Sequence, residues 1–292
     1  HLLVLTRRPA RSARLYRRIW EEAGSPLLLH SQRQVAGVQD RLGDRFRVTL
    51  GMRYGAPSIN SAVARFRAEG IDRIVVFSMF PQFCSATTGS VYDAVYRAAQ
   101  GRVCPFFQER RRFMPALHMV PPYYDHPAYI SCLEKRMREE VACSGEPDRY
   151  LITFHGIPAR FVAEGDPYRK QCEVTAHLLA EALGLEPDRW ISGFQSRFGK
   201  EEWLQPYTEE LLLGFGATGV ETVMATCPGF TADCLETLDE IGTEGNRQFA
   251  EGGGHKLTLV PCLNDYPPWL DVMADMIRCE SGNWLDESLT GR

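Results

Sequence analysis

The sequence predicts an α/β fold with mostly parallel sheets, arranged in two doubly wound lobes. Apolar segments rich in β-branched residues alternate with helical segments along the chain, and this alternation is typical of parallel sheets covered by helices. The segment 71–79 contains the run Ile-Val-Val-Phe, as expected of a strand buried on both faces. The two halves also carry similar motifs in the same order, so we expect one lobe to repeat the other.

The elements of the first half follow from periodicity and from turn residues. Residues 7–18 carry six arginines among apolar residues and predict an amphipathic helix. Its basic face is either solvated or attracts carboxylates or an anionic membrane surface. The remaining expected elements are helices at 28–42, 56–69, 91–99 and 129–142, and strands at 46–52, at 71–79 and within 118–124.

A polar connector at 143–149 suggests a boundary between an N-terminal lobe at 1–145 and a C-terminal lobe at 146–292. Asp166 and Pro167 form a suitable start for a helix that runs to residue 183. The other expected elements of this half are strands at 150–154, 190–194, 220–225 and 257–260, and helices at 205–215, 231–240 and 268–279.

Three short matches support the internal repeat. Arg-Tyr-Gly at 53–55 corresponds to Arg-Phe-Gly at 197–199, each after an expected strand. An apolar strand follows each motif, and each of those strands runs into a Pro-x-Phe turn, at 81–83 and 228–230. Two similar lobes would leave a cleft between the carboxyl edges of their sheets, wide enough for a large flat molecule.

Composition excludes several classes of function. The 292 residues carry a net charge of −4, so no global positive field attracts nucleic acid. Nine cysteines with no CxxC pair and no signal peptide predict reduced thiols in a cytoplasmic protein. No apolar run reaches the ~20 residues of a membrane span, and peripheral membrane contact stays open.

The segment 226–240 carries the strongest local signal of a site. A buried strand ends at Pro228 and Gly229, and a helix follows on which Asp233, Glu236 and Glu240 share one face. Carboxylates therefore lie at the carboxyl edge of a sheet, where open α/β sheets bind ligands. The alternative is a solvated helix face.

His155 also lies at a loop mouth, directly after an expected strand and before Gly156 and Pro158. An imidazole there can accept protons or ligate a transition metal, although a lone histidine is often structural. The sequence has no HExxH zinc motif, no Walker A or GxGxxG motif and no GxSxG elbow. A zinc hydrolase, a nucleotide-binding protein and a serine hydrolase are therefore not supported.

A set of motifs over residues 10–275 resembles ferrochelatase of the bacterial protoporphyrin type, a member of the class II chelatases. The motifs are Phe-His-Gly-Ile-Pro at 154–158, Gly-Asp-Pro-Tyr at 165–168, Cys172 to Thr175, Phe-Gln-Ser-Arg-Phe-Gly at 194–199, Glu-Trp-Leu-Gln-Pro-Tyr-Thr at 202–208, Cys-Pro-Gly-Phe at 227–230, Asp-Cys-Leu-Glu-Thr-Leu at 233–238, Pro-Cys-Leu-Asn at 261–264, Gly-Met-Arg-Tyr-Gly at 51–55, Pro-Gln-Phe at 81–83 and Thr-Thr-Gly-Ser at 87–90.

The resemblance implies two flavodoxin-like lobes and a lyase that inserts ferrous iron into protoporphyrin IX, giving protoheme and two protons in the last step of heme biosynthesis. His155 and Glu236 match the family's catalytic and metal-binding pair. The positions that match its proton path and porphyrin pocket are Asp233, Glu240, Trp203, Arg97 and Tyr54. Iron is a substrate here, and no tightly bound cofactor is expected.

The sequence also departs from the family pattern. Nothing before Arg7 matches the family's opening strand and Gly-Thr-Pro loop, so we expect the first lobe to lack its N-terminal βα unit. The tail after Cys279 has no cysteine, so no iron–sulfur cluster is expected. We expect a cytoplasmic monomer whose partners are protoporphyrin IX and ferrous iron, without nucleic acid, and peripheral membrane contact stays open. The alternatives are a chelatase for another tetrapyrrole and metal, such as coproporphyrin, sirohydrochlorin or cobalt, and an inactive porphyrin-binding protein.

Overall fold

The computed structural model describes residues 13, 15–101 and 113–285, in two compact units. The first unit comprises 1–31 and 124–265, and the second comprises 32–123 and 266–292. This division differs from contiguous lobes at 1–145 and 146–292. Helix α5 (Pro127–Ser144) packs on α7 (Tyr168–Leu183) in the first unit, whereas α11 (Pro267–Ser281) packs on strands of the second. The expected loss of an N-terminal βα unit concerns residues outside the described ranges.

The first unit is built on a four-stranded parallel sheet in the order β4-β3-β5-β6. Its strands are β3 (Arg149–His155), β4 (Trp190–Gln195), β5 (Thr222–Thr226) and β6 (Lys256–Leu259). In sequence order this is the 2-1-3-4 arrangement of flavodoxin-like sheets. The chain leaves β3 toward one edge and β5 toward the other, so the topological switch lies between these two strands.

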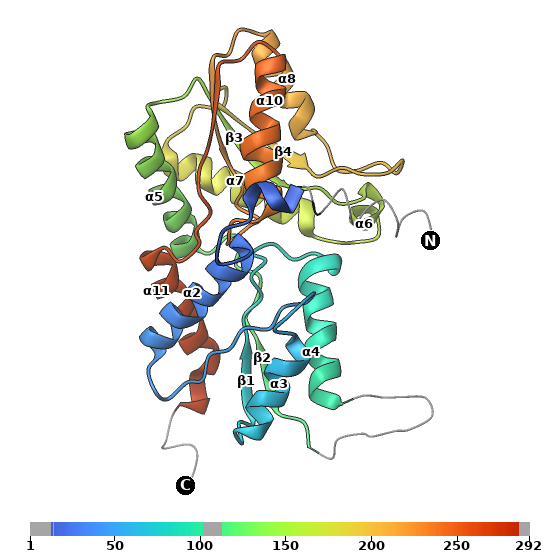
Figure 1. Ribbon diagram of the computed structural model, residues 1–292, viewed down its shortest axis with the longest axis vertical. Coiled ribbons are helices and arrows are strands. Elements are labelled where there is room, and N and C mark those ends of the chain that lie inside the picture. The colour runs from blue at the N-terminus through green and yellow to red at the C-terminus, as the bar shows by residue number, and fades with distance from the viewer. Residues whose placement is uncertain (1–12, 14, 102–112, 286–292) are drawn as a thin grey trace. The chain divides into compact units, whose positions relative to one another are not determined.

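Helices cover both faces of this sheet (Figure 1). α5 and α7 pack together on one face, and α8 packs with α10 on the other. The apolar runs and the turn residues at their ends thus produce the doubly wound arrangement that the sequence predicts. The remaining helices of this unit are α6 (Ala159–Ala163), α8 (Thr208–Ala217), α9 (Leu235–Thr237), the π-helix η2 (Leu238–Gly245) and α10 (Asn246–Glu251).

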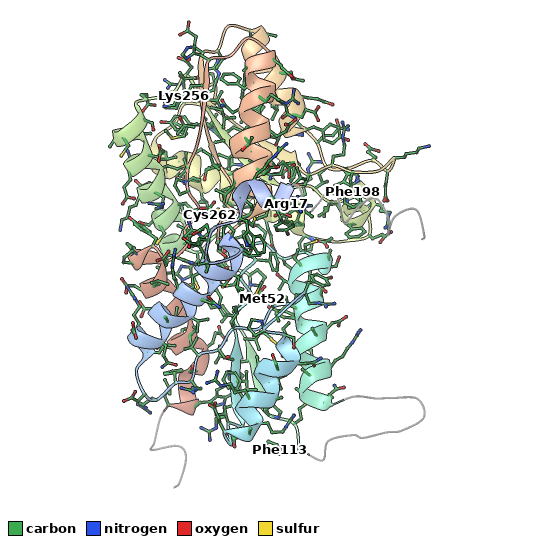
Figure 2. All side chains as sticks on the ribbon, viewed as in Figure 1. Arg17, Met52, Phe113, Phe198, Lys256 and Cys262 are labelled. Atoms are coloured by element: carbon green, nitrogen blue, oxygen red, sulfur yellow. The ribbon has the colours of Figure 1, made fainter. Side chains whose placement is uncertain are left out.

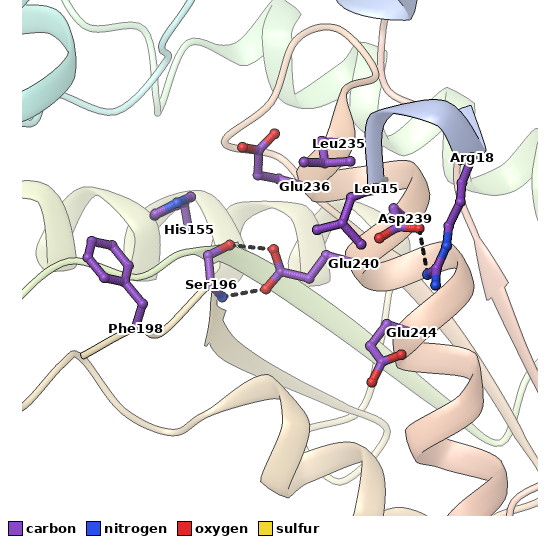
Figure 3. Close-up of a pocket in the computed structure, with 10 residues that line it drawn as sticks. All are labelled: Leu15, Arg18, His155, Ser196, Phe198, Leu235, Glu236, Asp239, Glu240 and Glu244. Atoms are coloured by element: carbon purple, nitrogen blue, oxygen red, sulfur yellow. Dashed lines mark hydrogen bonds and ion pairs between the residues drawn. The ribbon is translucent and has the colours of Figure 1, made fainter. Parts of the chain in front are cut away.

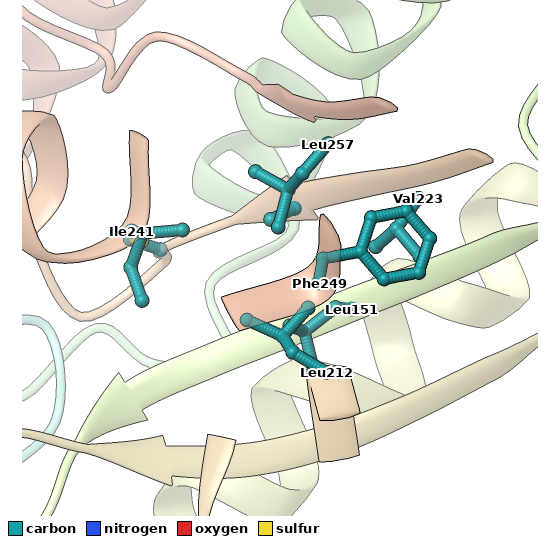
Figure 4. Packing of buried hydrophobic residues seen from close by; sticks show 8 residues of the cluster. Leu151, Leu212, Val223, Ile241, Phe249 and Leu257 are labelled. Atoms are coloured by element: carbon teal, nitrogen blue, oxygen red, sulfur yellow. The ribbon is translucent and has the colours of Figure 1, made fainter. Parts of the chain in front are cut away.

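The core beneath α8 and α10 is formed by apolar side chains from three strands and their helices (Figure 4). Leu151 of β3, Leu212 of α8 and Phe249 of α10 have no exposed surface. Burial of such side chains is the main stabilising term of a domain. This packing fixes α8 and η2 relative to the strand ends that precede them.

We expect Leu212→Ala to lower the free energy of unfolding by about 2 to 5 kcal/mol, because it leaves a cavity in a filled core. Chemical denaturation of the purified chain measures this loss. Leu213→Ala is the matched control, since the neighbouring side chain is 36% exposed, and its effect should stay within about 0.5 kcal/mol. Equal losses for the two variants would contradict the packing described.

The second unit holds a two-stranded parallel sheet with helices on both faces (Figure 1). Strand β1 (Arg73–Val76) pairs with β2 (Ala116–Met119), and α11 packs on both. The other elements are α2 (Pro26–Leu42, which begins in the first unit), α3 (Ile59–Ala68), the π-helix η1 (Ser85–Gly89), α4 (Ser90–Gln100) and the 3-10 turn η3 (Gly282–Trp284).

The strand expected at 46–52 is not formed. Residues 46–51 are irregular, and Met52 (labelled in Figure 2) makes an isolated bridge to Ser58. A strand needs a neighbour to pair with, and no strand of the described residues pairs with this segment. No helix in the described ranges is long and apolar enough to cross a bilayer.

Candidate active site

A cavity of about 660 Å³ opens at the carboxyl edge of the first unit's sheet (Figure 3). Its polar walls come from the ends of β3 and β4 and from the helical segment that follows β5. It therefore lies at the topological switch, where sheets of this type bind ligands. The lining residues are Leu15, Arg18, His155, Ser196, Phe198, Leu235, Glu236, Asp239, Glu240 and Glu244.

His155 is the last residue of β3, and its imidazole faces this cavity. Its Nδ1 lies 2.6 Å from the carbonyl oxygen of Gly156. A carbonyl oxygen only accepts, so Nδ1 carries the proton, and the neutral ring keeps its lone pair on Nε2. The hydroxyl of Tyr168 donates to the carbonyl of His155 at 2.9 Å, which fixes the backbone from the other side. The ring is thus held so that Nε2 is chemically able to accept a proton or bind a metal.

Aromatic rings support the imidazole. The ring of Trp203 lies 6.3 Å from that of His155 and 4.7 Å from that of Phe198, between centroids. Trp203 is buried, whereas Phe198 is more than half exposed and lines the cavity (Figure 3). A Cβ on Gly156 would lie 3.1 Å from the Trp203 ring and 2.9 Å from the carbonyl of Gln195. Glycine at 156 therefore permits this close approach of strand and ring.

Four carboxylates reach the cavity from the helical segment after β5 (Figure 3): Glu236, Asp239, Glu240 and Glu244. The segment winds as a π-helix from Leu238 to Gly245, a rare geometry that is frequent at functional sites. Arg18 Nη1 lies 3.3 Å from the Asp239 carboxylate, which is 7% exposed. Glu244 pairs with Arg247, which lies outside the lining, whereas no ion pair of Glu236 or Glu240 with an arginine or lysine is found among the described residues. The wall is therefore acidic and suited to a cation or to protons.

Glu240 is bound by Ser196 through two hydrogen bonds. Its carboxylate accepts from the Ser196 amide and from the Ser196 hydroxyl, each at 2.6 Å. Ser196 has φ of +66°, a conformation that non-glycine residues adopt at a cost. Burial raises the pKa of Glu240, while the Ser196 bonds and nearby His155 act in the opposite direction. The carboxyl is therefore held in one position, and burial favours its protonated form more than in a free carboxyl.

We expect Glu240→Gln to stabilise the fold at neutral pH. The folded-state pKa is raised, so the unfolded chain releases its proton first, and the stability of the wild type falls as pH rises through this interval. Glutamine does not ionise, so it makes no pH-dependent contribution to stability, and its side chain can keep both contacts with Ser196. The variant's gain in unfolding free energy over the wild type should be near zero below pH 4.5, the ordinary pKa of a glutamate carboxyl. It should reach its maximum once the pH exceeds the raised pKa.

Glu244→Gln is the control with the opposite sign. The ion pair with Arg247 lowers the pKa of Glu244, so its ionised form favours the fold, and this contribution is lost as pH falls through the lowered pKa. Urea titrations of both variants at acid and neutral pH separate the two cases. A Glu240→Gln variant that is less stable than the wild type at neutral pH would contradict the assignment.

Asp233, expected on the same helix face, lies outside the lining of this cavity. It precedes the helix, which begins at Leu235, and is 4% exposed. Its carboxylate accepts from Thr237 Oγ1 at 2.9 Å and from Asn264 Nδ2 at 2.7 Å. These bonds fix the turn between β5 and the acidic helix, so Asp233 positions the segment that carries Glu236.

Arg97 and Tyr54 belong to the second unit, and both are exposed. Arg97 pairs with Asp93 on its own helix, and the Arg53 guanidinium lies 4.6 Å from the centre of the Tyr54 ring. Four further lining residues were not among the expected site residues: Ser196, Asp239, Glu244 and Arg18. Ser196 lies in the 194–199 motif and Arg18 in the basic segment 7–18. The four-residue spacing from Glu236 through Glu240 to Glu244 is a signal that could have extended the acidic stripe.

The fold and this site define a chelatase-like α/β protein. SirB from Bacillus subtilis, solved with Fe3+, shares the fold with a TM-score of 0.58 at 14% identity, over 87% of this chain and 91% of SirB. DR2241 from Deinococcus radiodurans, described as structurally similar to chelatases, gives 0.52 at 13% identity, over 88% and 52%. At these identities the likeness concerns the fold alone.

The family model named Ferrochelatase matches residues 1–281. The ferrochelatase of Azoarcus sp. (strain BH72) is 44% identical over 285 residues, covering 97% of this chain and 76% of the relative. That of Edwardsiella ictaluri (strain 93-146) is 44% identical over 275 residues, covering 94% and 83%. The chain belongs to the ferrochelatase family, whose reaction is insertion of iron into protoporphyrin IX in heme biosynthesis.

Proposed function

We propose that this chain inserts ferrous iron into protoporphyrin IX with His155 and Glu236 as its catalytic pair. The reaction replaces two pyrrole N–H protons with one Fe²⁺ and releases both protons. It needs a base close to the macrocycle and ligands that exchange the metal's water. The Nε2 lone pair of His155 can do either, and the carboxylate of Glu236 lines the same cavity.

The acidic wall supplies the second part of the mechanism. Glu236, Glu240 and Glu244 follow one another at four-residue intervals along the segment that lines the cavity. Carboxylates spaced in this way can pass protons outward or hydrated Fe²⁺ inward. The raised pKa of Glu240 favours proton exchange at that position. Asp233 supports the wall by fixing its turn, and Trp203 supports the imidazole.

The single observation that carries this proposal is the shared cavity of His155 and the acidic helix. Its test is anaerobic insertion of Fe²⁺, and of Zn²⁺ as a stable surrogate, into protoporphyrin by the purified chain. Metal insertion appears as loss of free-porphyrin fluorescence together with a metalloporphyrin absorbance spectrum. Fluorescence quenching without the new spectrum would indicate binding without catalysis and would contradict the proposal.

We further propose that the chain is a cytoplasmic monomer without a resident cofactor. We also propose that its two units arose by duplication. Matched local pairing supports the duplication: Met52 N donates to Pro57 O at 2.7 Å, and Phe194 N donates to Pro206 O at 2.8 Å. Both π-helices also follow a cysteine N-cap and a Pro-x-Phe turn, with Cys84 before η1 and Cys234 before the α9–η2 segment. Sedimentation velocity tests the monomer.

A further inference from the structure

Gln195, the last residue of β4, is buried and bonds to the backbone beside both members of the proposed catalytic pair. It lies opposite His155 in the register of β3 and β4, and its main-chain carbonyl accepts from the amide of Gly156 at 2.8 Å. Its side-chain Nε2 donates to the carbonyl of Glu236 at 2.6 Å. One residue therefore links the strand end that carries the imidazole to the helical segment that carries the acid.

The orientation of the Gln195 amide is fixed by its partners. The Glu236 carbonyl oxygen only accepts, so the amide nitrogen faces it. The amide oxygen accepts from the hydroxyl of Thr153 at 3.1 Å, and that hydroxyl lies 2.7 Å from the hydroxyl of Thr208. Because a hydroxyl has one proton, Thr208 donates to Thr153. These buried bonds run in one direction from α8 through β3 and β4 to Glu236, and such a satisfied network is rigid.

The second unit has neither end of this link. The Arg-Tyr-Gly and Arg-Phe-Gly motifs match Gln195 with Gly51, and counting from the N-cap cysteine of each helical segment matches Glu236 with Ala86. The π-helix η1 nevertheless forms after the corresponding turn, so this part of the fold does not require the two side chains. The amide and the acid occur together in the unit that carries His155.

We propose that Gln195 is a positioning residue for iron insertion, whose amide holds the Glu236 backbone at a fixed place relative to His155. This inference rests on the proposed function, because it takes these two side chains as the catalytic pair. Groups that serve one reaction must be held within about 0.5 Å of their productive geometry. Gln195 is not among the lining residues of the cavity, so it acts through the pair and not by contact with porphyrin or metal.

The test replaces the amide and measures anaerobic Zn²⁺ insertion into protoporphyrin. Gln195→Met keeps an unbranched side chain of similar length but removes both side-chain bonds. We expect its kcat to fall at least tenfold, while its KM for protoporphyrin stays within twofold. Gln195→Asn keeps an amide that is one carbon shorter, so it cannot bond to Thr153 and Glu236 together. It should lose kcat at least tenfold as well, and it decides the question alone if Gln195→Met does not fold.

Leu179→Ala is the control for a general loss of stability. Leu179 has no exposed surface and lies on α7, outside the cavity lining. Alanine there leaves a hole in the core, so the urea midpoint should fall while kcat stays within twofold of the wild type. A tenfold loss of kcat in this variant would assign the effect of the Gln195 variants to stability and would overturn the proposal.

The Glu236→Gln background separates positioning from maintenance of the fold. Once the acid is replaced, adding Gln195→Met should lower turnover less than twofold, because no carboxylate is left to position. A merely structural role gives the same factor in both backgrounds. That result, or wild-type turnover in Gln195→Met or Gln195→Asn, would overturn this inference and leave the proposed function intact. Wild-type turnover in Glu236→Gln itself would overturn the proposed pair together with this inference, so the two failures are distinguishable.

Discussion

His155→Ala is expected to lower the turnover of iron insertion by about 10²- to 10⁴-fold, the usual range for loss of a group that transfers protons. The imidazole is positioned by its Nδ1 bond to the Gly156 carbonyl and by the Tyr168 bond to its own carbonyl. Alanine removes the Nε2 lone pair but leaves the backbone bond from Tyr168. Porphyrin binding, measured by fluorescence quenching, should therefore change much less than turnover.

His177→Ala is the matched control for this variant. His177 also bonds through Nδ1 to a backbone carbonyl, that of Glu173, but it lies on the exposed face of α7. Its replacement should leave metal insertion and porphyrin binding unchanged. If His155→Ala turned over at the rate of His177→Ala, the imidazole would have neither a proton-transfer nor a metal-binding role, and the proposed catalytic pair would be wrong.

The strands of the first unit were predictable because each is a short apolar run that ends in turn residues. The run expected at 150–154 is β3 at 149–155, and its position places His155 at the sheet edge. The strand expected at 46–52 is absent because of its surroundings and not because of its local sequence. Its local sequence is suitable for a strand, but strand formation depends on a neighbour in space, which the described part of the second unit lacks.

The acidic wall was predictable only in part. Helical spacing places Glu236 and Glu240 on one face, as the structure does, but it assumes an α-helix that includes Asp233. The helix begins at Leu235, two residues after Asp233. Asp233 instead bonds to Asn264 and to the amide of Cys262, which lie 31 and 29 residues further along the chain. The π-helical winding and the positive φ of Ser196 also depend on tertiary contacts, which no local pattern encodes.

The second large effect is expected for Glu236→Gln, which should reduce turnover by about 10²-fold. Glutamine keeps the size of the side chain, and the bond from Gln195 Nε2 to the Glu236 carbonyl, at 2.6 Å, keeps the backbone in place. What is lost is a carboxylate in the cavity that His155 also lines. The variant should bind porphyrin normally and insert Fe²⁺ slowly, as measured by metalloporphyrin formation under anaerobic conditions.

Glu209→Gln, in the first turn of α8 and outside the cavity lining, is the same substitution in the same unit and should retain full turnover.

The double variant His155→Ala, Glu236→Gln tests whether the two groups act together. Groups that serve one step give a combined loss smaller than the product of the single losses. Independent, fully multiplying losses would place the imidazole and the carboxylate in separate steps, with proton removal and iron delivery divided between them. Wild-type turnover in Glu236→Gln would remove Glu236 from the mechanism and leave Asp239, Glu240 and Glu244 as the carboxylates that line the cavity.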